Sequence, residues 1–156
     1  MRALTDPDRG LVKLKPRATT IAAVSRLAAP NPVPTRRRTA FQRQAWEVVA
    51  QIVKFRLDPD GFVELVLFDG GAYIRAGMPP PECLTKASRA RRTVAAVRAR
   101  FAATCGQPRP DWQDLGAIGY VSGVGFWSPR RLPHEAAPNG AELQPVTSLR
   151  LIAGCR

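Results

Sequence analysis

The sequence predicts a mainly β fold with one helix, in which five strands form a small barrel behind a disordered basic arm. Short runs of alternating apolar and polar residues, separated by tight turns, predict the strands. One stretch with helical periodicity interrupts them. The first 43 of the 156 residues hold ten basic and two acidic side chains and a proline-rich segment, which together are typical of an unstructured arm.

We therefore divide the chain into a disordered arm over residues 1–43, an OB-fold-like barrel over residues 44–152 and a tail over residues 153–156. In the arm, the alternating prolines of residues 29–34 exclude helix and central strand, because a proline lacks the backbone donor and restricts the residue before it. A basic cluster follows at once and consists of Arg36, Arg37 and Arg38.

The first half of the barrel is predicted as a meander with strands over residues 45–57, 62–68 and 72–78. The apolar alternation of the first strand slips by one residue between Ile52 and Val53, which predicts a bulge that bends this strand. Tight turns are predicted where aspartate, proline and glycine gather between the strands.

The second half is predicted to hold a helix over residues 87–103 and strands over residues 115–127 and 142–152. The four glycines of the first of these strands predict tight curvature or the close approach of another backbone, and Pro145 predicts an edge or bulge. The arginines of the helix lie largely away from its apolar face, a pattern more typical of a solvated surface than of a dedicated binding face. They are Arg89, Arg92, Arg98 and Arg100.

This order of elements, three strands, a helix and two strands, is that of the five-stranded Greek-key barrel called the OB-fold. An open α+β sheet has the same order and stays the alternative.

Three blocks of sequence resemble an uncharacterised family of small bacterial proteins. The blocks are DGFVELVL over residues 60–67, PPPEC over residues 79–83, and VSGVGFW over residues 121–127 with APNGAELQPV over residues 137–146. The family's pattern ends in GVGFF, HGQ and APNGIELHPV, and it implies a barrel similar to the staphylococcal-nuclease form of the OB-fold. Two histidines of that pattern fall at Arg131 and Gln144 here, which favours binding over catalysis.

The composition limits the chemistry that this chain can perform. Cys83, Cys105 and Cys155 have no zinc-binding spacing, and the single His134 excludes sites built on two histidines. The sequence predicts no cofactor and no metal, and it leaves one disulfide open for an exported protein. Residues 18–29 only loosely resemble an export signal, so the sequence favours a cytoplasmic protein. No apolar run is long enough to span a membrane.

The net charge of +12 indicates a polyanion partner, although the excess of arginine over lysine is also typical of a GC-rich genome. The leading hypothesis is a non-catalytic binding module for a polyanion such as single-stranded nucleic acid. Its predicted site joins the basic cluster to aromatic and basic residues at one end of the barrel: Arg36, Arg37, Arg38, Phe126, Trp127, Arg130 and Arg131. Phe126 and Trp127 are equally compatible with a role in the core.

Two alternatives stay open. The first is a divalent-dependent phosphodiesterase of the staphylococcal-nuclease class, for which the candidate residues are Asp58, Asp60, Arg75 and Glu82. An ordinary hairpin turn is the favoured interpretation of its two aspartates. The second alternative is a structural or protein-interaction domain.

Overall fold

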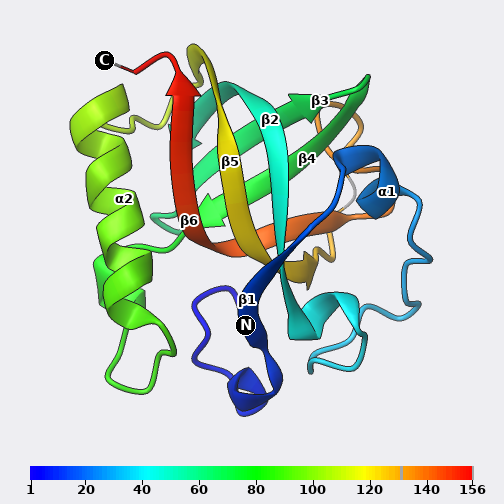
Figure 1. Cartoon of the computed structure of the whole chain (residues 1–156). Helices are drawn as coiled ribbons and strands as arrows, with labels where there is room; N and C mark the ends of the chain where they lie inside the picture. Colours follow the sequence, from blue (N-terminus) through cyan, green and yellow to red (C-terminus); the bar gives the residue numbers. More distant parts are fainter. Residues whose placement is uncertain (131, 156) are drawn as a thin grey trace.

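The computed structural model describes residues 1–130 and 132–155, and it shows six strands and two α-helices in these ranges (Figure 1). In chain order they are β1 (Lys13–Ala18), α1 (Ile21–Ser25), β2 (Gln44–Leu57), β3 (Val63–Asp69), β4 (Ala72–Met78), α2 (Arg91–Cys105), β5 (Gln113–Trp127) and β6 (Ala141–Ala153). The prediction of one helix was therefore wrong, because α1 lies within the segment that was expected to be disordered.

Five of the strands close a nearly complete ring in the order β2, β3, β4, β6, β5 and back to β2. All neighbours in the ring are antiparallel except β4 and β6, which pair in parallel. Because α2 connects β4 to β5, the ring has the Greek-key order expected of an OB-fold-like barrel. The sixth strand, β1, pairs in parallel with β2 outside the ring.

Two local features of the ring agree with the sequence patterns. The register of β2 against both of its neighbours shifts between Ile52 and Lys54, where the alternation slips. In β5, a Cβ atom on Gly119 would lie 2.7 Å from the carbonyl oxygen of Arg150, so another backbone does approach closely. The bulge and the glycine contact allow long strands to bend into a narrow ring.

The disordered arm is the clearest error of the sequence prediction, because residues 1–43 fold against the barrel. Leu4, Val12, Ile21 and Val24 are all at least 98 % buried. Arg37 is also buried, and it is held by the Asp6 carboxylate and the main-chain oxygen of Gln42. These buried apolar side chains are spaced too irregularly to resemble a strand or a long helix, so the sequence pattern did not reveal them.

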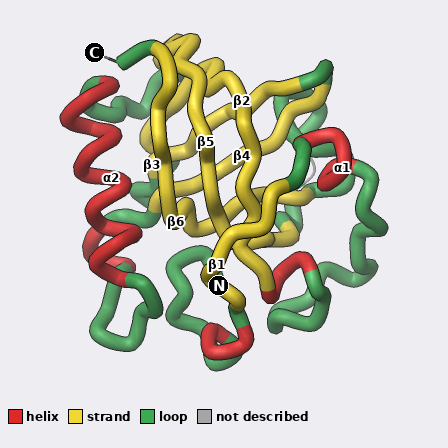
Figure 2. The backbone as a smooth tube through the Cα atoms, viewed as in Figure 1, coloured by secondary structure: helices red, strands yellow, loops and turns green. Residues whose placement is uncertain are grey.

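The helices lie on different sides of the ring (Figure 1, Figure 2). Helix α2 runs beside β6, and its Phe101 ring meets Phe55 of β2 edge-on with centroids 5.0 Å apart. A disulfide joins Cys105, the last residue of α2, to Cys155, just after β6. Helix α1 packs Ile21 and Val24 into the barrel core.

Candidate nucleic-acid interface

OB-folds bind oligonucleotides on the outer face of their second and third strands, which are β3 and β4 here. In this chain the outer face of β3, β4 and the adjoining parts of β2 and β6 is largely covered by other segments. Glu64 and Arg75 are 9 % and 6 % exposed, and Gln144 is 4 % exposed. We call this surface the covered face; its polar residues are Lys54, Arg56, Glu64, Arg75, Glu142 and Gln144.

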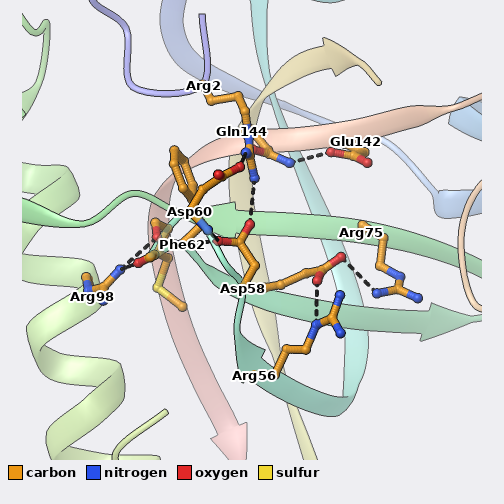
Figure 3. Close-up of polar contacts among 12 residues, drawn as sticks. Arg2, Arg56, Asp58, Asp60, Phe62, Arg75, Arg98, Glu142 and Gln144 are labelled. Atoms are coloured by element: carbon orange, nitrogen blue, oxygen red, sulfur yellow. Dashed lines mark hydrogen bonds and ion pairs between the residues drawn. The ribbon is translucent and has the colours of Figure 1, made fainter. Parts of the chain in front are cut away.

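The cations of the covered face have acidic partners within the chain, and Figure 3 shows the contacts of Arg56 and Arg75. The carboxylate of Glu64 accepts hydrogen bonds from Arg56 Nε and Arg75 Nη1, each at 2.9 Å. Lys54 Nζ lies 2.5 Å from the carboxylate of Glu135. The three cations surround the ring of Trp112 at 4.4–5.1 Å. Because each of these cations already has an acidic partner and contacts the Trp112 ring, it is less available to a phosphate than an unpaired arginine.

Glu142 lies at the β6 side of the same face. Burial raises the pKa of its carboxyl group above the usual range, and a hydrogen bond with Ser128 opposes that shift. The amide of Gln144 donates to the Glu142 carboxylate, and its oxygen accepts a hydrogen bond from Arg2. The Gln144 side chain therefore has both of its polar atoms engaged by residues of the same chain.

The predicted aromatic residues differ in their exposure. Trp127 is 2 % exposed, packs against Phe41 with centroids 4.9 Å apart, and donates from Nε1 to Thr39 Oγ1 at 3.0 Å. Neither face of this indole is open to a base. Phe126 is half-buried, Arg130 is exposed, and Arg131 lies outside the described residues.

The predicted basic cluster is also divided. Arg37 is 1 % exposed and holds the N-terminal segment. Arg36 pairs with Asp8, and the hydrogen bond between them raises the pKa of Arg36 and lowers that of Asp8. Arg38 is exposed. Of this cluster, Arg38 has the guanidinium most available to an external anion.

The phosphodiesterase candidates are held by internal contacts. Asp58 Oδ1 accepts hydrogen bonds from the amides of Asp60 and Phe62, as in an ordinary turn, and Asp58 Oδ2 pairs with Arg2 at 3.2 Å. Arg75 is bound to Glu64. Within residues 1–130 and 132–155, no three His, Cys, Asp or Glu side chains gather around a common point.

A second surface with a different character lies between α2 and β6. It is a groove of about 570 Å³ that continues into a neighbouring hollow of about 430 Å³. Exposed arginines from both elements flank it, and no acidic residue is among the described residues that line it. We call it the α2–β6 groove; its cations are Arg92, Arg100 and Arg150.

The sequence of α2 explains this placement. The helix contains four arginines and no acid, and it buries Val94 and Phe101. Arg98 turns inward and donates to the main-chain oxygens of Gly61 and Met78, and burial lowers its pKa. Arg92 and Arg100, eight residues apart, line the groove instead. Sequence periodicity placed these arginines off the apolar face, but it did not show which of them meet the barrel.

Acidic partners are lacking around these groove cations. In the described part of the chain, no carboxylate lies within ion-pair distance of Arg92, Arg100 or Arg150. The Arg150 guanidinium lies 4.0 Å over the ring of Tyr120 on the neighbouring strand β5. The groove thus combines unpaired guanidinium groups with an aromatic ring at its border.

Comparison with known proteins supports the fold. No protein-family model and no curated protein matches this chain. Among solved structures, it is similar to part of a protein from Leishmania major Friedlin that is assigned as an aspartyl-tRNA synthetase, with a TM-score of 0.50 and 13 % sequence identity. The match covers 90 % of this chain but only 21 % of that protein.

No helix among the described residues is long and apolar enough to cross a membrane. At this level of identity the structural similarity establishes the architecture alone, and the architecture is an OB-fold-like barrel.

Proposed function

We propose that this chain is a non-catalytic module that binds a polyanion, specifically single-stranded nucleic acid, in the α2–β6 groove. One observation carries the proposal: Arg92, Arg100 and Arg150 flank an open groove and have no acidic partner among the described residues. The total charge of the chain is weaker support, because many of its cations are already paired.

The chemistry of the groove suits a phosphate backbone. Guanidinium groups make bidentate hydrogen bonds to phosphate, and their neutralisation of phosphates releases counterions. The hydroxyl groups of Thr93, Thr104 and Ser148 line the same groove and add neutral donors. Tyr120 gives a ring near the border on which a base can stack once Arg150 moves to a phosphate.

The architecture gives secondary support. OB-fold barrels are a common scaffold for oligonucleotide binding. The similar protein from Leishmania is, by its name, an enzyme that acts on tRNA. In this chain, however, the cations of the covered face are paired, so the arginines of α2 and β6 are more accessible to a phosphate than those of the covered face.

The sequence also predicted a site around Arg38 and Arg130, which are exposed on other parts of the surface. We retain them as a competing surface, and they provide a matched control. Arg26, at the end of α1, is likewise exposed. Removing Arg26, Arg38 and Arg130 changes the net charge by the same amount as removing the three groove arginines.

The test is the binding of a short labelled single-stranded oligonucleotide, measured by fluorescence anisotropy between about 50 and 200 mM salt. The groove variant combines Arg92→Gln, Arg100→Gln and Arg150→Gln. The control variant combines Arg26→Gln, Arg38→Gln and Arg130→Gln. If the groove binds three phosphates, the groove variant lowers the slope of log affinity against log salt by about two, since each phosphate contact contributes about 0.7.

The control variant should keep the slope of the unmodified chain. Equal loss in both variants would show that net charge alone drives binding, and a selective loss in the control variant would place the site at Arg38 and Arg130. Absence of binding at the lowest salt would overturn the proposal.

Cleavage of the probe in the presence of divalent ions would favour the phosphodiesterase alternative. Its candidate residues receive no comparable support, because Asp58 and Arg75 are already bound to other side chains.

A further inference from the structure

A second candidate binding site lies where the N-terminal segment reaches the covered face (Figure 3). The guanidinium of Arg2 meets three acceptors there. Its Nη2 lies 3.2 Å from Asp58 Oδ2, its Nη1 lies 3.4 Å from Asp60 Oδ2, and its Nε lies 2.5 Å from Gln144 Oε1. Its Cζ atom lies 3.8 Å above the centre of the Phe62 ring.

The shape of this site fits a guanidinium group in particular. A planar fork can direct three N–H bonds outward in its own plane while its face stacks on an aromatic ring. An ammonium group is a compact point charge and cannot do both. The Asp58 side chain is 4 % exposed and Gln144 is also buried, whereas the Asp60 side chain is 71 % exposed.

Two of the three acceptors, Asp58 and Gln144, are also held by contacts that do not involve the Arg2 side chain. Asp58 Oδ1 is fixed by the amides of Asp60 and Phe62, which leaves Oδ2 directed at the guanidinium. Gln144 donates to the Glu142 carboxylate and so keeps its oxygen toward Arg2. Residues 1–4 join no strand; Ala3 and Leu4 are buried, whereas the Arg2 side chain is 24 % exposed and is the part of this segment that can leave the pocket.

We propose that Asp58, Asp60, Phe62 and Gln144 form an arginine-binding pocket, which the chain's own Arg2 fills in this structure. When Arg2 is withdrawn, the pocket accepts an arginine side chain from a partner peptide. This proposal is independent of the nucleic-acid function, because the pocket is acidic and lies outside the α2–β6 groove. It makes the N-terminal segment an internal competitor of the partner.

The test uses the full-length chain with Arg2→Ala and follows its thermal unfolding with added N-acetylargininamide. The ligand binds the folded state only, so the variant should gain Tm in a saturable manner, by roughly 2–4 °C once binding contributes a stabilisation near RT ln 5. N-acetyllysinamide at the same ionic strength should give less than half that gain. The unmodified chain, whose pocket is filled, should respond to neither compound.

A second variant separates the pocket from the fold. Asp58→Asn keeps the oxygen that accepts the turn amides and replaces the one that faces Arg2 by an NH₂ group. The double variant Arg2→Ala, Asp58→Asn should lose the response to N-acetylargininamide. An equal response to the lysine compound, a response that survives Asp58→Asn, or no response in Arg2→Ala would each overturn the pocket. None of these results bears on oligonucleotide binding by the groove.

Discussion

The covered face and the α2–β6 groove are both rich in arginine, yet they differ in electrostatic state. On the covered face, Arg56 and Arg75 share the carboxylate of Glu64 beneath other segments of the chain. Along the groove, Arg92, Arg100 and Arg150 face solvent without an acid in the described residues that line it. The pairing of cations, more than their number, therefore indicates where a polyanion can bind.

The two regions should also differ in what their side chains contribute to stability. A buried cation that satisfies a buried carboxylate cannot be removed without leaving an uncompensated charge. An exposed arginine without a partner contributes little to folding, and near the start of a helix it is slightly unfavourable.

The largest effect is expected from the disulfide that joins the two sides of the groove. Replacing Cys105 and Cys155 by serine removes a link between residues 50 positions apart, and the loss of this restraint on the unfolded chain should cost about 4 kcal/mol. Urea unfolding of the variant and of the parent chain gives this difference. Cys83→Ser, which removes the free thiol, is the control and should change the stability far less.

The next largest effect is expected on the covered face. Arg75→Met keeps the aliphatic stem but removes one of the two cations that bind Glu64, so the free energy of unfolding should fall by about 2 kcal/mol. The measurement is again urea unfolding. Oligonucleotide affinity should stay within twofold of the parent under folding conditions. A stable Arg75→Met chain that no longer binds the oligonucleotide would place the binding site on the covered face.

Glu142 should reveal itself in the pH dependence of stability. Because burial raises its pKa in the folded state, the native chain holds this proton more tightly than the unfolded chain does. Its contribution to stability is therefore greatest below the unfolded pKa of about 4.3 and declines as pH rises through the higher folded pKa.

Glu142→Gln removes that ionisation. Its Tm relative to the parent should rise with pH from about 4.3 and become constant above the folded pKa. Thermal unfolding of both proteins across this range checks the prediction, and pH curves that run parallel would contradict it.

The smallest effect on stability is expected in the groove. Arg92 stands in the first turn of α2, where the helix dipole disfavours a cation, so Arg92→Gln should leave the free energy of unfolding unchanged or raise it by about 0.3 kcal/mol. The same variant should weaken oligonucleotide binding. A loss of stability above about 1 kcal/mol would mean that Arg92 has a structural role.

The sequence predicted the ring well, because strand alternation and turn chemistry are local signals. The slip between Ile52 and Val53 predicted the bulge of β2, and the glycines of β5 predicted its close contact with β6. The N-terminal segment was missed for the opposite reason. Its order depends on Leu4, Val12 and the Arg37–Asp6 pair, which are contacts with distant residues that no local pattern reveals.

The candidate site was predicted less well, since pairing is a property of the folded chain. Arg36 and Arg37 formed a conspicuous basic cluster, yet the fold pairs both with acids of the N-terminal segment. The sequence showed the arginines of α2, but its pattern favoured a solvated helix face over a binding face. Only the structure shows that Arg98 turns inward while Arg92 and Arg100 line a groove against β6.

Hydrogen–deuterium exchange with and without a single-stranded oligonucleotide distinguishes the α2–β6 groove from the other surfaces of the chain. We expect the oligonucleotide to slow exchange in α2 and in residues 147–154, while residues 63–78 on the covered face exchange as in the free chain. Slower exchange confined to residues 63–78, or to the surroundings of Arg38 and Arg130, would contradict it.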